Sequence, residues 1–138
     1  MVEDDKVLMV NHRMHDAGVL WSPPGGGLNF GEHAVECLKR EIREETGLEA
    51  DVLEFLFACE YIGHPLHAVE LFFSVVRRQG TLTTGFDPEA PATGQIIRDV
   101  RFLSFGEIIA LPPGQRHGVF SHAKNTHDLL ELRGFLTV

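Results

Sequence analysis

The stretch from Gly26 to Leu48 constrains the fold more than any other part of the chain. It reads GGLNFGEHAVECLKREIREETGL, a glycine-rich turn followed by apolar residues at helical spacing. This spacing predicts an amphipathic helix from about His33 to Thr46. Four apolar residues form its expected buried stripe: Ala34, Val35, Leu38 and Ile42. Gly47 stands where a glycine commonly ends a helix, so the expected boundary is sharp.

The same helix carries a cluster of acidic side chains within three turns: Glu36, Glu41, Glu44 and Glu45. The last three lie on neighbouring ridges, and we expect them to face away from the buried stripe. Like charges at these spacings weaken a helix by a few tenths of a kcal/mol per pair, so a bound cation would explain them. Carboxylate oxygens suit Mg²⁺ or Mn²⁺. The alternative is a solvated face, salt-bridged by the interleaved Lys39, Arg40 and Arg43.

The composition narrows the classes of partner. The chain has 138 residues, which fits one domain over 1–138, and 43% of them are apolar. A net charge of −8 argues against binding a nucleic-acid polymer or an anionic membrane. No apolar run is long enough to cross a bilayer, and no secretory leader is evident. Cys37 and Cys59 stand alone in apolar segments, which predicts buried free thiols and a cytoplasmic location.

The rest of the chain predicts a mixed sheet with helices packed on it. Strands are expected at Lys6–Val10, Val19–Trp21, Val52–Ile62, Ala68–Arg78 and Val100–Leu103, the third and fourth as an antiparallel pair. Helices are expected at Phe105–Ala110 and His122–Arg133. The loops are Asn11–Gly18, Gln79–Gln95 and Leu111–Val119. The eight histidines are scattered, which is typical of loop or surface positions rather than of a zinc site.

The glycine turn and the acidic helix together form a spaced pattern. Gly26 is followed after five residues by Glu32, and after seven more by Arg40-Glu41-Ile42; Glu44-Glu45, Gly47 and Leu48 complete it. With average residue usage, a chance match is roughly one in 10⁸ or rarer per starting point. The stretch resembles the Nudix box at every position of its consensus. The preceding Trp21-Ser22-Pro23-Pro24-Gly25-Gly26 resembles the entry common in that family.

The resemblance implies an α/β/α sandwich around a mixed sheet. It also implies hydrolysis of a nucleoside diphosphate linked to another moiety, with Mg²⁺ or Mn²⁺ as cofactor. By position, Glu41, Glu44 and Glu45 would be the metal ligands, with a main-chain carbonyl of Gly25 or Gly26. Arg40 would orient a glutamate, and it belongs with Glu41, Glu44 and Glu45 to the expected catalytic residues. Glu32 and Gly47 would support the site structurally.

Further site residues are expected in loops. Glu89, in Asp87-Pro88-Glu89, is the candidate general base, and a solvated loop carboxylate is the alternative. Gly26 and Gly27 permit the main chain to approach a substrate. Arg13 and Arg116 can hold phosphate, or be ordinary surface arginines. Trp21, with Phe30, Tyr61 and Phe120, can stack on a base, or pack in the core or a loop.

The leading functional expectation is a metal-dependent pyrophosphohydrolase acting on a small-molecule nucleotide. ADP-ribose or another sugar nucleotide is favoured, because Pro65 and the run His67–Phe73 resemble ADP-ribose-cleaving relatives. The alternatives are a house-cleaning nucleoside triphosphate pyrophosphohydrolase and a non-catalytic nucleotide-sensing domain. Only Met1 and Val2 precede the first turn, so we expect a shortened first strand. The exposed edge would be covered by another segment or by a second copy in a homodimer.

Overall fold

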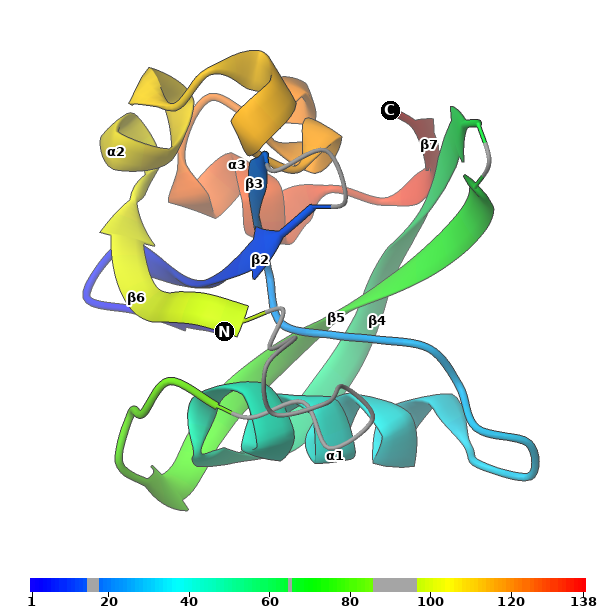
Figure 1. The fold of residues 1–138 in the computed structure, drawn as a ribbon, viewed down its shortest axis with the longest axis vertical. Helices are drawn as coiled ribbons and strands as arrows, with labels where there is room; N and C mark the ends of the chain where they lie inside the picture. Colours follow the sequence, from blue (N-terminus) through cyan, green and yellow to red (C-terminus); the bar gives the residue numbers. More distant parts are fainter. Residues whose placement is uncertain (15–17, 65, 86–96) are drawn as a thin grey trace.

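The structure is a computed structural model that describes residues 1–14, 18–64, 66–85 and 97–138. Two β-sheets lie between helix α1 (Ala34–Thr46) and the shorter helices α2 (Phe105–Ala110) and α3 (Thr126–Glu131) (Figure 1). This confirms the expected α/β/α class. Among the described residues, no helix is both long and apolar enough to span a membrane.

The first sheet is antiparallel and is built around β2 (Lys6–Arg13). Strand β6 (Ile97–Ser104) pairs along β2 from Lys6 to His12. Strands β1 (Val2–Glu3) and β3 (Val19–Ser22) therefore share the opposite edge of β2, one after the other. The first strand is short, as expected, and β3 of the same chain covers the rest of that edge.

The second sheet contains the two longest strands of the described chain. β4 (Leu48–Gly63) and β5 (Leu66–Gly80) form the predicted antiparallel pair. A strand that we did not predict, β7 (Gly134–Thr137), lies parallel to β4 on its other edge. The order β5-β4-β7 makes this sheet mixed and leaves β5 at one edge.

Strand β2 separates two apolar cores. Val7 and Met9 face a core that includes Phe57 and Phe120, whereas Leu8 and Val10 face a core that includes Ile42 of α1. The four β2 residues are at most 3% exposed. Alternate side chains of a strand point to opposite faces, so a strand buried on both faces is apolar throughout. The Ile42 core is what holds α1 against the sheets.

Helix α1 begins and ends almost where the sequence predicts. His33 is the N-cap residue, and Gly47 ends the helix in the left-handed conformation with φ of 70°. The amide of Gly47 donates to the carbonyl oxygen of Arg43 at 3.0 Å. One member of the predicted buried stripe is misplaced: Val35 is exposed. It lies in the first turn of the helix.

Two other predictions were wrong in extent. Strand β2 continues through Asn11 to Arg13, which we expected in a loop, because β3 pairs with these polar residues. The predicted helix His122–Arg133 is only α3, since Asn125 caps its start by accepting from the amide of Asp128 at 2.8 Å. The chain around His122 instead forms a 3₁₀ turn, Gly118–His122.

Candidate active site

Arg40 is the centre of the site. Its guanidinium binds Glu32 through two nitrogens, at 2.9 and 3.0 Å. A third, Nη1, donates to Glu41 at 2.7 Å and to Glu44 at 3.1 Å. Nη2 also donates to the carbonyl oxygen of Gly27 at 3.2 Å. One planar cation thus connects the glycine turn to two turns of α1, which a point charge could not do.

Glu32 joins the turn to the helix on the other side of this contact. Its carboxylate accepts from the amide of Asn29 at 3.1 Å as well as from Arg40. The hydrogen bond from Arg40, followed by that from Asn29, lowers the pKa of Glu32 to about 2. Hydrogen bonds to the carboxylates of Glu32, Glu41 and Glu44 raise the pKa of Arg40. Both groups are therefore charged across the whole physiological range.

The glycine turn lies directly against two of the candidate metal ligands. The amide of Gly25 donates to Oε2 of Glu45 at 2.9 Å. A Cβ atom added to Gly26 would lie 2.8 Å from Oε2 of Glu41 and would overlap its Oε1. Atoms at ordinary contact are at least 3.4 Å apart, so a larger residue at this position would displace the carboxylate. The turn and the acidic helix are built to fit one another.

Glu45 differs from our expectation that all three glutamates face away from the core. It is only 6% exposed. The reason is helical geometry: Glu45 is seven residues after Leu38 and three after Ile42, so it shares their face. Nε2 of His12 lies 3.7 Å from its Oε1. We missed His12 because we placed it in a loop rather than at the end of β2.

The donors suit the hard divalent cation that the resemblance implies. Glu41, Glu44 and Glu45, with the carbonyl oxygen of Gly25, supply only oxygen atoms, and the missing Cβ of Gly26 keeps the turn close to Glu41. In the described part of the chain, no three His, Cys, Asp or Glu side chains already converge on one point. Glu41 and Glu44 instead face Arg40, so they would have to turn toward a shared ion.

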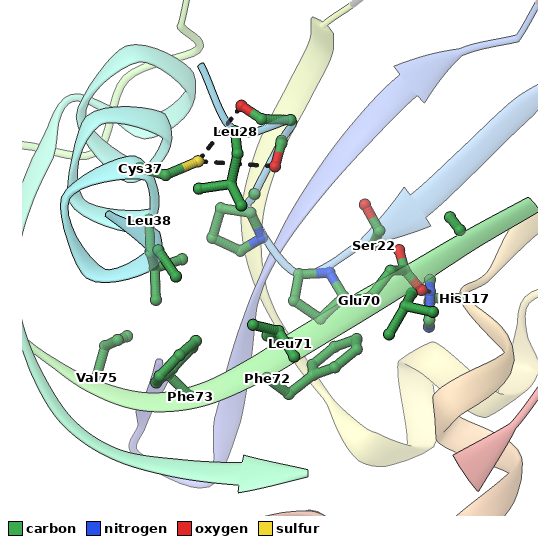
Figure 2. Close-up of a pocket in the computed structure, with 18 of the residues that line it drawn as sticks. Ser22, Leu28, Cys37, Leu38, Glu70, Leu71, Phe72, Phe73, Val75 and His117 are labelled. Carbon is green, nitrogen blue, oxygen red and sulfur yellow. Dashed lines mark hydrogen bonds and ion pairs between the residues drawn. The ribbon is translucent and has the colours of Figure 1, made fainter. Parts of the chain in front are cut away.

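Cys37 adds a contact that sequence reasoning did not suggest. Its thiol lies 3.4 Å from the carbonyl oxygen of Gly27 and 3.8 Å from that of Gly26 (Figure 2). Burial, at 4% exposure, raises the pKa of the thiol. Cys37 and Cys59 are both free and buried, as predicted. Cys37 therefore acts as a neutral packing residue beneath the turn.

The structure places some of the predicted substrate-binding residues at a cavity and others elsewhere. Gly26 and Gly27 line a cavity beside α1, but Trp21 is 9% exposed and belongs to a core. Arg13 ends β2 and is exposed. Arg116 donates to the carbonyl oxygens of Ile109 and Leu111, so it braces its own loop. Glu89 and Pro65 lie outside the described residues.

The cavity is lined from three directions: by the turn 22–28, by α1 through Cys37 and Leu38, and by β5 (Figure 2). Its volume is about 520 Å³. On its wall, Nε2 of His117 lies 2.9 Å from Oε2 of Glu70. Sequence reasoning missed this pair because the residues are 47 positions apart, and no local pattern relates them.

Comparison with known proteins agrees with the geometry. The family model described as the NUDIX domain matches residues 1–123. The RNA pyrophosphohydrolase of Bartonella clarridgeiae is 34% identical over 70 residues, which cover 45% of this chain and 40% of that relative. The chain thus aligns with less than half of that relative's length.

Two solved structures share the fold across nearly the whole chain. A MutT NUDIX hydrolase from Burkholderia pseudomallei has a TM-score of 0.66 at 21% identity and covers 95% of this chain and 90% of its own. An ADP-ribose pyrophosphatase from Streptococcus suis has a TM-score of 0.63 at 19% identity, with 98% and 92% covered. With the matched family model and the box assembled around Arg40, these likenesses lead to one conclusion: the chain belongs to the Nudix hydrolase family.

Proposed function

We propose that this Nudix hydrolase cleaves the pyrophosphate of a nucleoside diphosphate linked to another moiety, with Mg²⁺ or Mn²⁺ as its cation. Action on pyrophosphate bonds is the activity of the family to which the chain belongs. The finer statement rests chiefly on one observation: the glycine turn is held against Glu41 and Glu45, beside a cavity able to take a second group.

We assign roles to the residues by their contacts. Glu41, Glu44 and Glu45 would hold the cation with the carbonyl oxygen of Gly25. When bound, the cation would polarise the pyrophosphate and lower the pKa of an attacking water. Arg40 keeps Glu41 and Glu44 next to the turn, at 2.7 and 3.1 Å. Glu89 stays our proposed general base.

The nature of the second moiety is the open part of the proposal. We favour a sugar nucleotide, either ADP-ribose or another; Pro65, which partly suggested ADP-ribose, lies outside the described residues. A nucleoside triphosphate is the competing substrate. Several relatives are named RNA pyrophosphohydrolases, and the net charge of −8 disfavours a polymer.

A substrate panel tests the proposal. Purified protein is incubated with ADP-ribose, GDP-sugars, UDP-sugars, nucleoside triphosphates and a short 5′-triphosphorylated RNA, with Mg²⁺ or with EDTA. We expect release of a nucleoside monophosphate from a sugar nucleotide, abolished by EDTA and restored by Mg²⁺. Tight binding of one compound with no turnover of any would support the nucleotide-sensing alternative and sink the proposal.

Glu44→Gln and Glu45→Gln test the metal ligands. Each substitution keeps the shape of the side chain, and in Glu45→Gln the new side-chain carbonyl can still accept from the amide of Gly25. Turnover should fall by orders of magnitude, while the unfolding temperature changes little. The matched control is Glu36→Gln: Glu36 is exposed on the same helix, and its one ion pair among the described residues is with Lys39, at 3.5 Å. Unchanged turnover in both site variants contradicts the assignment.

A further inference from the structure

The wall of the cavity beside the glycine turn carries a carboxylate, that of Glu70, whose role is still unassigned. Its wall is mostly apolar: Pro23, Pro24, Leu28, Leu38, Leu66, Leu71 and Phe72 contribute to it. Glu70 projects from β5 near His117 and Ser22 at the end of this wall (Figure 2). The apolar side chains around this carboxylate offer it no hydrogen bonds, so its partners must be polar groups.

His117 holds this carboxylate in place. Nδ1 of His117 accepts from the amide of Val119 at 3.1 Å, so the ring hydrogen must be on Nε2. Nε2 therefore donates to Oε2 of Glu70 at 2.9 Å. The backbone amide of His117 donates to the carbonyl oxygen of Trp21 at 2.9 Å, and its ring lies 5.6 Å from that of Phe72. His117 is thus fixed on several sides.

Glu70 retains accepting capacity toward the cavity. Its side chain is 40% exposed, and among described residues only His117 binds it. An ionised carboxylate has about four lone-pair positions and no donor. A ligand group at this point must therefore present N–H or O–H donors. The apolar wall around it suits a flat base better than a sugar, whose remaining hydroxyl groups would be left without partners.

We propose that Glu70, positioned by His117, accepts hydrogen bonds from N1–H and N2–H of a guanine-type base bound in this cavity. This inference rests on the proposed function, because Gly25 and Gly26 line the same cavity and lie next to Glu45 and Glu41, two of the candidate metal ligands. Two adjacent donors match a carboxylate, whereas adenine would turn the lone pair of its N1 toward it. Within the sugar-nucleotide class, this favours a guanosine nucleotide over ADP-ribose.

Equilibrium binding tests the inference without catalysis. Wild-type protein is titrated calorimetrically, in EDTA, with GMP, with IMP, which lacks the N2 amine, and with AMP. Losing one hydrogen bond to a charged group should weaken binding about tenfold or more, so GMP should bind best, then IMP, then AMP. Glu70→Gln should bring GMP close to IMP.

The control variant is Glu60→Gln. Glu60 of β4 also pairs with a histidine, His67 of β5, at 2.9 Å, but it is not among the residues lining the cavity. It should leave all three affinities unchanged. His117→Gln can still donate to Glu70 and should keep the preference for GMP, whereas His117→Ala should reduce it. A purely structural role for His117 would lower stability without changing the GMP-to-IMP ratio.

Three results would overturn the inference. Equal binding of GMP, IMP and AMP would exclude base reading, and an unchanged preference in Glu70→Gln would exclude this residue as the reader. A large loss for dGMP relative to GMP, with IMP equal to GMP, would place a ribose at Glu70 instead. Failure of the proposed function has a different signature: no turnover of any compound in the panel, whatever the order of affinities.

Discussion

Replacing Gly26 by alanine should lower turnover strongly while changing the free energy of unfolding little. Gly26 has no positive φ, so alanine can adopt its backbone conformation. The new Cβ would instead meet the carboxylate of Glu41, with Oε2 at 2.8 Å against an ordinary contact of at least 3.4 Å, and with Oε1 closer still. The carboxylate is the end of a flexible side chain, so it can move by about 1 Å at little cost to the fold. A misplacement of about 1 Å in a catalytic group lowers turnover about 10²-fold.

The assay compares turnover with the free energy of unfolding for Gly26→Ala and two other alanine variants. Gly27 is its neighbour, but a Cβ there meets nothing within 4 Å, so its loss of turnover should be much smaller. Gly106, in α2, has equally open surroundings and lies outside the site. Its variant should keep full turnover. Gly26→Ala should lose about 10²-fold in turnover and under about 1 kcal/mol in stability.

Three outcomes would refute the reasoning. If Gly26→Ala keeps full turnover, the contact with Glu41 does not matter for catalysis. If it loses stability as strongly as turnover, the turn is a folding element first, and the carboxylate cannot yield as we infer. A loss shared equally with Gly27→Ala would indicate a general loop effect.

Three further changes test the surroundings of the site. Arg40→Lys keeps the charge but loses the planar fork that reaches Glu32 and the turn together, so turnover should fall about tenfold or more in a steady-state assay. The pKa of Glu32 is about 2 in the folded protein against 4.5 normally, so its ionised form stabilises the fold above about pH 4.5. Thermal unfolding should show this advantage over Glu32→Gln shrinking as the pH falls from 4.5 toward 2, and a constant difference would contradict it. Gly47→Ala should lower the free energy of unfolding in urea by more than about 1 kcal/mol, because φ is 70° and a Cβ would lie 2.9 Å from the carbonyl oxygen of Thr81. Gly134→Ala, with φ of 89° and open space around it, should lower this free energy less.

Local pattern was enough to predict the elements near the box. Apolar spacing and Gly47 located α1 to within a residue, because a helix depends on residues three and four apart. The β4–β5 pair followed from two long apolar runs separated by a turn. Contacts close in sequence were therefore largely predictable.

Contacts between residues far apart in the sequence could not be predicted. The predicted helix ran on to Arg133 because Leu132 continues an apolar stripe, and only pairing with β4 makes the next residues the strand β7. The carboxylate of Glu45 accepts from the amide of Gly25, twenty residues earlier. Glu70 and His117 meet only once β5 and the 3₁₀ segment are folded together. Their identities carried no hint of proximity.

The way α1 ends has a consequence for how this chain can vary. The amide of Thr83 donates to the carbonyl oxygen of Thr46 at 2.9 Å, and that of Gly85 to the carbonyl oxygen of Glu45 at 2.8 Å. Segments after an edge strand ordinarily tolerate insertions. Here an added residue between Gly80 and Thr83 would shift both amides out of register and free the carbonyl of Glu45, a candidate metal ligand. The length of this segment is therefore tied to the helix end that carries Glu45.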